Sequence, residues 1–285
     1  MFAVSVVLAA FAACCNAFSS VLQRKANRAE AEDVPFGPRL LLDVLRRPAW
    51  LGGFLAMIAS FLLQATALGY GSLALVEPVL AVELPLTLVL AGWLLHRPVS
   101  RRDGWTAAAM AAGLALFLAA LDPTGGSAAG VKTTPALLAT GVTAAGVAAL
   151  AAGAHFGPAR FKAALFGAAS GAAFGLTASL MKLAVETLRH HGVAAMFTGW
   201  HVYAMAVAGV VALLLLQAAL HAGTLVEAQP GITLLDPLVS VLWGIVVLGE
   251  RTRTGLVLVL AGVGAAGLAA AAFALVRSPT LAHDR

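Results

Sequence analysis

Residues 73–95 read LALVEPVLAVELPLTLVLAGWLL, a run of 23 residues. A helix of about 20 apolar residues crosses the hydrocarbon core of a bilayer, so this run predicts a transmembrane helix. Two carboxylates, Glu77 and Glu83, interrupt it. A charged side chain at membrane depth is costly and faces protein or water rather than lipid. The run therefore predicts a membrane protein with acidic groups in its interior.

The composition of the whole chain agrees with this prediction. Hydrophobic residues make up 61% of the 285 residues and charged residues only 11%, and the mean hydropathy is +0.93. Soluble domains carry about 25% charged residues, so an ordinary soluble domain is excluded. The net charge of +5 lies in no basic run interleaved with aromatic residues, and we expect no nucleic-acid partner. Cys14 and Cys15 are adjacent in an apolar run and offer neither a disulfide framework nor a zinc site.

Nine apolar runs are bounded by charge, proline or glycine, and each is long enough to predict a membrane span. The segment 22–48 after the first span carries too many charges to enter the hydrocarbon, and its residues 40–45 predict a short amphipathic helix at the interface. The nine predicted spans are 2–22, 49–69, 72–96, 104–121, 134–154, 161–187, 193–219, 223–249 and 254–276.

Lysine and arginine predict the orientation, because short loops rich in these residues stay in the cytoplasm. One side of the predicted loops receives thirteen of the 18 basic residues, six of them in segment 22–48. The other side receives four: Lys132, Arg189, Arg251 and Arg253. We expect a protein of the cell membrane with its N-terminus outside and its C-terminus in the cytoplasm.

The two halves of the chain resemble each other. An offset of 153 residues places four polar residues of the first half over four of the second: Gln64 over Gln217, Glu83 over Asp236, Thr87 over Ser240 and Arg97 over Glu250. One extra span between the halves inverts one unit relative to the other. The predicted fold is an all-α membrane protein of nine transmembrane helices with an inverted-topology repeat. Its parts are a first repeat at 1–121, a connecting span at 134–154, a second repeat at 161–276 and a cytoplasmic tail at 277–285.

Glu83 and Asp236 are the central candidate residues. Glu83 lies about 16 Å into its predicted span at 1.5 Å per residue, close to the bilayer midplane, and Asp236 lies at similar depth. Thr87 and Ser240 follow these acids by four residues and share their helix faces. A carboxylate with a neighbouring hydroxyl suits a hard cation or a transferable proton. The alternative is that both acids only fix helix packing through neighbouring donors.

Other polar residues extend this candidate site. Glu77 is shallower than Glu83 and about 120° away from it on a continuous helix, so the two need not share a site. Glu77 would instead line an outer vestibule, or would simply be solvated at the interface. Gln64 and Gln217 are amides in apolar helices, and Asn16 is a third; each predicts an interhelical hydrogen bond more readily than a ligand.

Prolines and glycines predict the shape of the helices. Pro78, Pro85, Pro230 and Pro237 each free a backbone carbonyl, which predicts kinks that move or offer oxygens to a substrate, although membrane prolines also occur without a role. The stripe Gly167, Gly171 and Gly175 permits close helix approach, within the chain or at a homodimer seam.

Three further features have simpler interpretations. Lys182 and Glu186 predict an ion pair near the outer end of span six, with an anion-binding cation as the alternative. His190 and His191 are expected in a solvated loop. Gly69-Tyr70-Gly71 echoes a potassium filter but lacks a pore helix, so a channel is not expected from it.

The ends of both halves carry a family resemblance. ALGYGSLALVEPVLAVELPLTLVLAGWLLHRPVSRRDGW and LLDPLVSVLWGIVVLGERTRTGLVLVLAGVGAAGL resemble the last two helices of an EamA-type unit of the drug/metabolite transporter superfamily. The nine spans, the charged segment after the first span and SLMKLAVE in the sixth are most similar to the NIPA-type branch, described as magnesium transporters. Phe61 stands where that branch has an acid, and Leu95-His96-Arg97 replaces a GER-like end.

These observations favour a secondary transporter that moves a small solute or cation by alternating access, with membrane lipids around it and no cofactor. The resemblance implies a Mg²⁺ or other divalent cation transporter as one alternative, and a lipid flippase or channel-like facilitator is a second. An enzyme is not expected, because HExxH, GxSxG and GxGD-type motifs and a P-loop are missing from the sequence.

Overall fold

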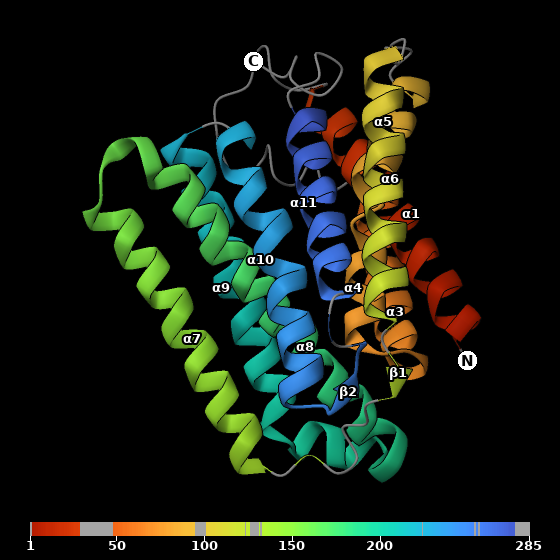
Figure 1. Cartoon of the computed structure of the whole chain (residues 1–285), viewed down its shortest axis with the longest axis vertical. Helices are drawn as coiled ribbons and strands as arrows, with labels where there is room; N and C mark the ends of the chain where they lie inside the picture. The colour runs from red at the N-terminus through yellow and green to blue at the C-terminus, as the bar shows by residue number, and fades with distance from the viewer. Residues whose placement is uncertain are drawn as a thin grey trace.

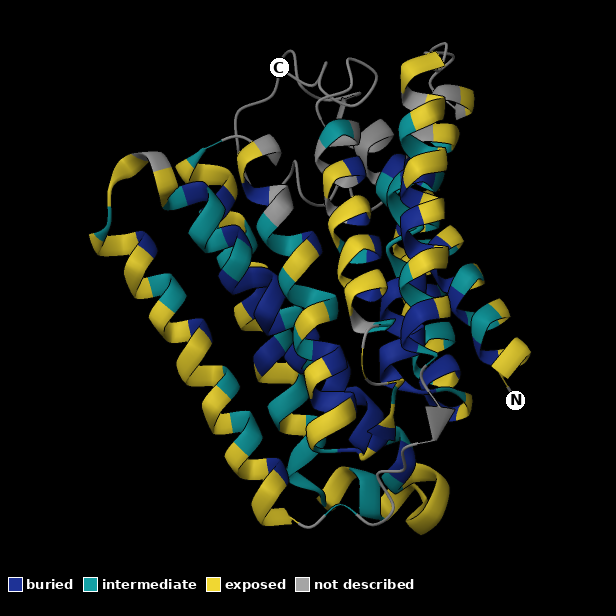
Figure 2. Cartoon of the chain, viewed as in Figure 1, coloured by how far each residue is buried: buried dark blue, intermediate teal, exposed yellow. Residues whose placement is uncertain are grey.

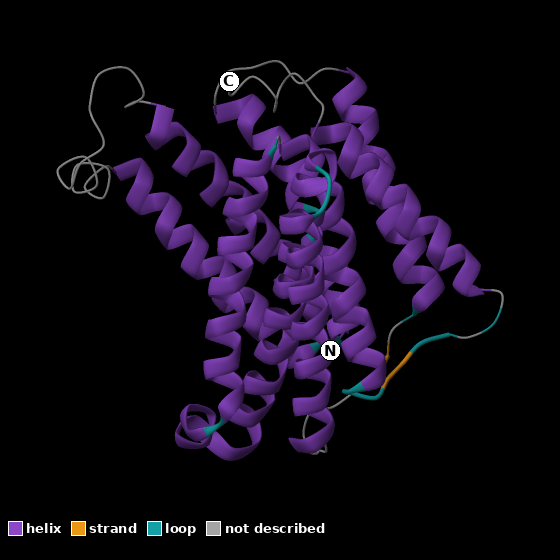
Figure 3. Cartoon of the chain, turned by 90° about the vertical axis from the view of Figure 1, so that its left-hand side faces the viewer, coloured by secondary structure: helices purple, strands orange, loops and turns teal. Residues whose placement is uncertain are grey.

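The fold is known from a computed structural model of the chain, and it is almost entirely helical (Figure 1, Figure 3). The residues that the structure describes are 2–28, 48–94, 101–122, 124–125, 131, 133–223, 225–253, 255 and 257–276. The predicted amphipathic helix at 40–45 and the tail at 277–285 lie outside these residues. The first half comprises α1 (Phe2–Arg28), α3 (Pro48–Tyr70), α4 (Leu73–Leu80), α5 (Glu83–Leu94) and α6 (Arg101–Leu121). The second half comprises α7 (Thr133–Phe156), η2 (Ala159–Phe161), α8 (Lys162–Thr198), α9 (Trp200–Ala222), α10 (Leu225–Val246) and α11 (Val257–Val276).

Six of the described helices are long and apolar enough to cross a membrane: α1, α3, α6, α7, α8 and α9. Two further apolar stretches, 231–246 and 259–268, are shorter. Hydrocarbon offers no partner to backbone N–H and C=O groups, which is why an apolar chain of this kind satisfies them within helices. The protein is therefore an all-α membrane-embedded protein.

Helix α8 forms the buried centre of one half, and α7 lies at the edge of the bundle with most of its surface exposed (Figure 2). Small side chains let α8 approach its neighbours α9 and α10 closely. In the other half, α1 packs against α3, α4 and α5. Helices α6 and α11 pack against each other, and α4 contacts α10. The two ends of the sequence are thus joined in one bundle.

A two-residue antiparallel pair joins the halves at one end of the bundle. Strand β1 (Thr124–Gly125) pairs with β2 (Glu250–Arg251), with Thr124 opposite Arg251. Figure 1 shows this pair at the lower end, near the turn between α8 and α9. Arg253 strengthens the junction, since its N–H donates to the Leu121 carbonyl and its guanidinium pairs with Asp122 at 2.8 Å.

The predicted span 72–96 is not one continuous helix. It breaks at Ala81 and Val82, between α4 and α5. Pro85 has no N–H to bond the Ala81 carbonyl, which instead accepts a 3.3 Å bond from the N–H of Leu84. The N–H groups of Ala81 and Val82 likewise bond carbonyls three residues back. The proline spacing predicted a kink, and in the structure a two-residue turn with tighter hydrogen bonds separates α4 from α5.

The predicted loop around His190 and His191 is also wrong. The first helical segment of α8 includes both histidines, and both side chains are exposed. The segment is interrupted at Gly192, whose φ of +82° and ψ of 178° are not helical, and a second segment runs from there to Thr198. Because a glycine accepts this φ without a steric clash, the chain turns sharply at this one residue.

Candidate functional site

Three carboxylates from three helices come together inside the bundle. Glu77 lies in the last turn of α4, Glu83 is the first residue of α5, and Asp236 lies in α10. The charges of Glu77 and Glu83 both act on Asp236. On a continuous helix the two glutamates would lie about 120° apart, and in the structure both lie near enough to Asp236 for their charges to act on it. The expectation that Glu77 and Glu83 need not share one site stays a prediction.

Amide side chains hold two of these acids. The Asn16 Nδ2 of α1 donates to Glu83 Oε2 at 2.6 Å, and the Gln64 Nε2 of α3 donates to Glu77 Oε1 at 3.0 Å. Glu77 is buried and Glu83 half-buried. Both contacts are interhelical hydrogen bonds, as expected for amides in apolar helices. Asn16 was not among the central candidates, although a lone amide in an apolar run was a signal for it.

Asp236 differs from the other two acids. Its Oδ1 is buried and has no hydrogen-bond partner, while the side chain as a whole is half-buried. Buried polar atoms are rarely left unpaired, and an exception calls for an explanation. The backbone at this position is pressed against α8, since a Cβ on Gly175 would lie 2.5 Å from the Asp236 carbonyl. Asp236 is therefore held by its backbone and open to a partner at its carboxylate.

The hydroxyls predicted beside the acids have a different environment. Thr87 and Ser240 are both buried. The Ser240 Oγ donates to the Gly175 carbonyl at 3.5 Å, which ties α10 to α8. Gln217 does not join the acids, because it lies on the exposed face of α9. Of the predicted amide pair, only Gln64 contacts a carboxylate.

The predicted prolines and glycines shape the helices around the acids. Pro78 lies within α4 and Pro85 follows the break. Helix α10 runs past Pro237 without a break, and the side chain of Pro230 lies outside the described residues. The stripe of Gly167, Gly171 and Gly175 faces α10, where added Cβ atoms would meet the backbone at Ala228, Ile232 and Asp236. This stripe is covered within the chain, so it offers no homodimer seam.

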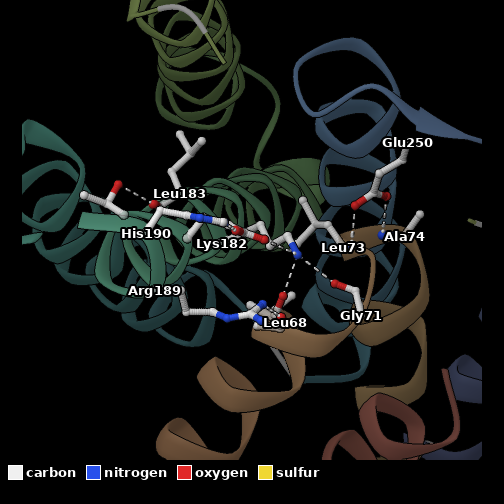
Figure 4. Close-up of polar contacts among 12 residues, drawn as sticks. Leu68, Gly71, Leu73, Ala74, Lys182, Leu183, Arg189, His190 and Glu250 are labelled. Carbon is white, nitrogen blue, oxygen red and sulfur yellow. Dashed lines mark hydrogen bonds and ion pairs between the residues drawn. The ribbon is translucent and has the colours of Figure 1, made fainter. Parts of the chain in front are cut away.

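A second polar cluster lies at the end of the bundle that carries β1 and β2 (Figure 4). Lys182 is buried, and its Nζ donates to the carbonyls of Leu68 at 2.5 Å and Gly71 at 2.8 Å. Arg189 donates to the Gly69 carbonyl. Lys182 also pairs with Glu186 at 3.4 Å, as predicted, but it is buried rather than solvated at an interface. The carbonyls of Leu68, Gly69 and Gly71 are thus bound by side chains of α8.

Glu250 holds the other side of the same turn. Its Oε1 accepts from the N–H of Leu73 at 2.5 Å, and its Oε2 accepts from the N–H of Ala74 at 3.0 Å. Burial raises the pKa of the Glu250 carboxyl; these two hydrogen bonds and the charge of Lys182 lower it in part. The sequence contained only a weak signal for this role, the GER-like end in which Glu250 stands.

No group of three or more His, Cys, Asp or Glu side chains within the described ranges is arranged to hold a metal ion. A separate cavity of about 230 Å³ lies between α7, α8 and α10. Its lining is apolar except for Thr143, which accepts a 3.0 Å bond from Trp243 Nε1. None of the three acids lines it.

Comparison with known proteins gives one distant relative. The chain is 28% identical over 213 residues to an uncharacterized protein of Corynebacterium glutamicum. The aligned region covers 74% of this chain and 73% of the relative. No family model matches the chain, and no solved structure is significantly similar to it.

Proposed function

We propose that this protein is a secondary transporter that moves a small solute or cation across the cell membrane by alternating access. The observation that carries the proposal is the convergence of Glu77, Glu83 and Asp236 beside the break between α4 and α5. Charged residues at membrane depth mark substrate or ion pathways, and broken helices are typical of transporter binding sites. The general architecture, an apolar helical bundle, fits a transporter.

The chemistry of the three acids favours a positively charged cargo. Carboxylates accept hydrogen bonds and attract cations. Asn16 and Gln64 each satisfy one oxygen of their acid, whereas the Asp236 Oδ1 has no partner. A cation or a proton at this point relieves the mutual repulsion of the acids. We therefore place the cargo or the coupling proton at Asp236, with Glu83 as its second anchor.

We further propose the nine spans and the inverted repeat of the predicted topology. Support comes from packing: α1 pairs with α3 as α8 pairs with α9, and α1 contacts α4 and α5 as α8 contacts α10. Another close pair, α6 with α11, consists of the last helix of each unit, as a pseudo-twofold axis requires. In this arrangement the N-terminus is outside and the C-terminus in the cytoplasm.

Membership of the drug/metabolite transporter superfamily, closest to the NIPA-type branch, remains our proposal from the resemblance. Mg²⁺ is therefore one cargo to test. A lipid flippase or a channel-like facilitator is the other alternative. In neither of these two do the acids need to bind a cargo or to exchange a proton.

The test is initial uptake in proteoliposomes, normalised to folded protein, with Mg²⁺, other divalent ions, amines and amino acids across pH. The isosteric changes Glu83→Gln and Asp236→Asn keep the size of each side chain and much of its hydrogen bonding. We expect transport to fall at least about 100-fold, because each amide removes a charge that the cargo or proton binds. The control is Glu227→Gln, which changes an exposed acid at the start of α10. Wild-type rates and an unchanged pH profile in both site variants would contradict the assignment.

A further inference from the structure

The start of α4 is not capped by its own sequence. Ser72 occupies the N-cap position, where serine commonly bonds the first free N–H groups of a helix. Its side chain makes no capping bond, and its Oγ is buried without a partner. The N–H groups of Leu73 and Ala74 are bonded instead by Glu250, which lies 177 and 176 residues further along the chain. The beginning of α4 therefore depends on the second half of the protein.

The end of α3 depends on the second half in the same way. Its final carbonyls are bound by Lys182 and Arg189 of α8, two cations placed where a helix C-terminus favours positive charge. Arg189 also lies over the ring of Tyr70, 5.5 Å from its centre. The charges of Lys182 and Glu250 attract each other across the turn. The α3–α4 turn is thus bound by Lys182 and Arg189 on one side and by Glu250 on the other (Figure 4).

Glu250 fits its place closely. Its carboxylate lies directly over Gly244 of α10, where any Cβ would collide with it. Gly249, with φ +66°, makes the tight turn that brings β2 back over the end of α10. The turn at Gly249 and the absence of a side chain at Gly244 together allow the Glu250 carboxylate to reach the N–H groups of Leu73 and Ala74.

The other end of α4 passes into α5 through a short turn, in which the N–H groups of Ala81 and Val82 bond carbonyls three residues back instead of four. The helix has only eight residues, and it ends at the break formed by Ala81 and Val82. Glu77 lies in its last turn. If the hydrogen bonds at the start of α4 were released, this turn is the place at which so short a helix would shift. Its movement carries Glu77 relative to Asp236.

We propose that Glu250 and Lys182 are positioning residues that latch the start of α4 and thereby close the acidic site toward the β1–β2 end of the bundle. Ala81 and Val82 form the hinge on which α4 moves when the latch opens. The closing of the acidic site by this movement rests on the proposed transport function. The latch at the start of α4 does not depend on that function, and its test measures no transport.

The test uses the full chain in nanodiscs, with Cys14 and Cys15 replaced by alanine and a reporter introduced by Val76→Cys in the buried face of α4. The reagent is a water-soluble maleimide. In Glu250→Gln we expect the labelling rate to rise about tenfold or more, because the amide retains only one acceptor oxygen for the two N–H groups. Hydrogen exchange of residues 71–80 should quicken with it, while exchange in α9 stays unchanged.

Two further variants keep the test decisive. Glu250→Asp retains the charge but is one methylene too short to reach both N–H groups, so it should give the same local effect if Glu250→Gln does not fold. Glu227→Gln, the same change in an exposed acid at the other end of α10, should leave labelling and exchange at the wild-type level. Unchanged labelling and exchange in a folded Glu250 variant, or quickening spread evenly over the protein, would overturn the latch. Loss of the transport proposal alone would leave both readouts intact.

Discussion

Single residues decide the chemistry of this bundle, and Glu250 is the clearest case. Its carboxylate is buried, yet it lies outside the membrane-spanning helices and accepts two backbone hydrogen bonds. Burial disfavours the charged form, and this effect exceeds the support from the N–H groups and from Lys182, so the net pKa is raised. A group at the same turn thus both organises α4 and makes the protein sensitive to pH.

The raised pKa predicts the sign of a pH effect on stability. A group whose pKa is higher in the folded state contributes stability that is complete below its ordinary pKa and is lost as the pH rises through the folded value. Wild type should therefore lose more thermal stability than Glu250→Gln as the pH rises above about 4.5, the ordinary value of a glutamate. Melting temperatures of both proteins in the same detergent measure this. Groups that are common to both proteins contribute equally, so their contribution cancels in the difference. An equal loss in the two proteins would mean that Glu250 does not carry the effect.

At the scale of helices, the close packing of α8 against α10 depends on glycines of α8, which have no side chain. A Cβ on Gly171 would lie 2.6 Å from the Ile232 carbonyl oxygen and 2.8 Å from its Cα. Backbone atoms cannot move aside as the end of a flexible side chain can. The two helices must therefore separate if the glycine gains a methyl group. Asp236 lies on the same face of α10, one turn further along.

Gly171→Ala should destabilise the protein by about 1–3 kcal/mol, the usual cost of overpacking a well-packed interior. The matched control is Gly141→Ala on the exposed surface of α7, where nothing lies within 4 Å of the added Cβ. Alanine is the better helix former, so this control should be neutral or stabilising by up to about 1 kcal/mol. Thermal unfolding of both variants in one detergent compares them. Equal stability of the two would show that the close approach at Gly171 is not required.

At the scale of the whole molecule, three sets of contacts connect the two halves. They are the β1–β2 pair, the packing of α6 against α11, and the hydrogen bonds between the α3–α4 turn and side chains of the second half. The hydrogen bonds of that turn with Lys182, Arg189 and Glu250 all cross from one half to the other. Movement of one half against the other must therefore change the position of α4. This is the motion that alternating access requires.

The proposed orientation predicts which ends of the helices face each side of the membrane. Ala159→Cys, exposed between α7 and α8, should be labelled only from the cytoplasmic side. Arg251→Cys, exposed in β2, should be labelled only from outside. Impermeant maleimide on intact cells and on inverted vesicles, in a chain without Cys14 and Cys15, makes the comparison. Labelling of both positions from one side would remove the nine-span topology, and reversed labelling would remove only the orientation.

The sequence by itself determined the class of the protein and most of its helices. The run of apolar residues is a local property, and it predicted 134–154 where the structure has Thr133–Phe156, and 49–69 where it has Pro48–Tyr70. The same locality identified Glu77, Glu83 and Asp236, because a carboxylate in an apolar run is conspicuous wherever it lies.

Only the tertiary structure decided what those residues contact. Glu77 and Asp236 are 159 positions apart in the chain, and Glu250 is 176 positions from the N–H of Ala74. No helical period relates residues so distant, and the partner of each depends on how the helices pack. The turn at Ala81 and Val82 is one such detail: two prolines predicted a kink, and in the structure α4 and α5 are separate helices that both pack against α1. Helix packing also places Glu77 and Glu83, which are six residues apart, near enough to one aspartate for both charges to act on it.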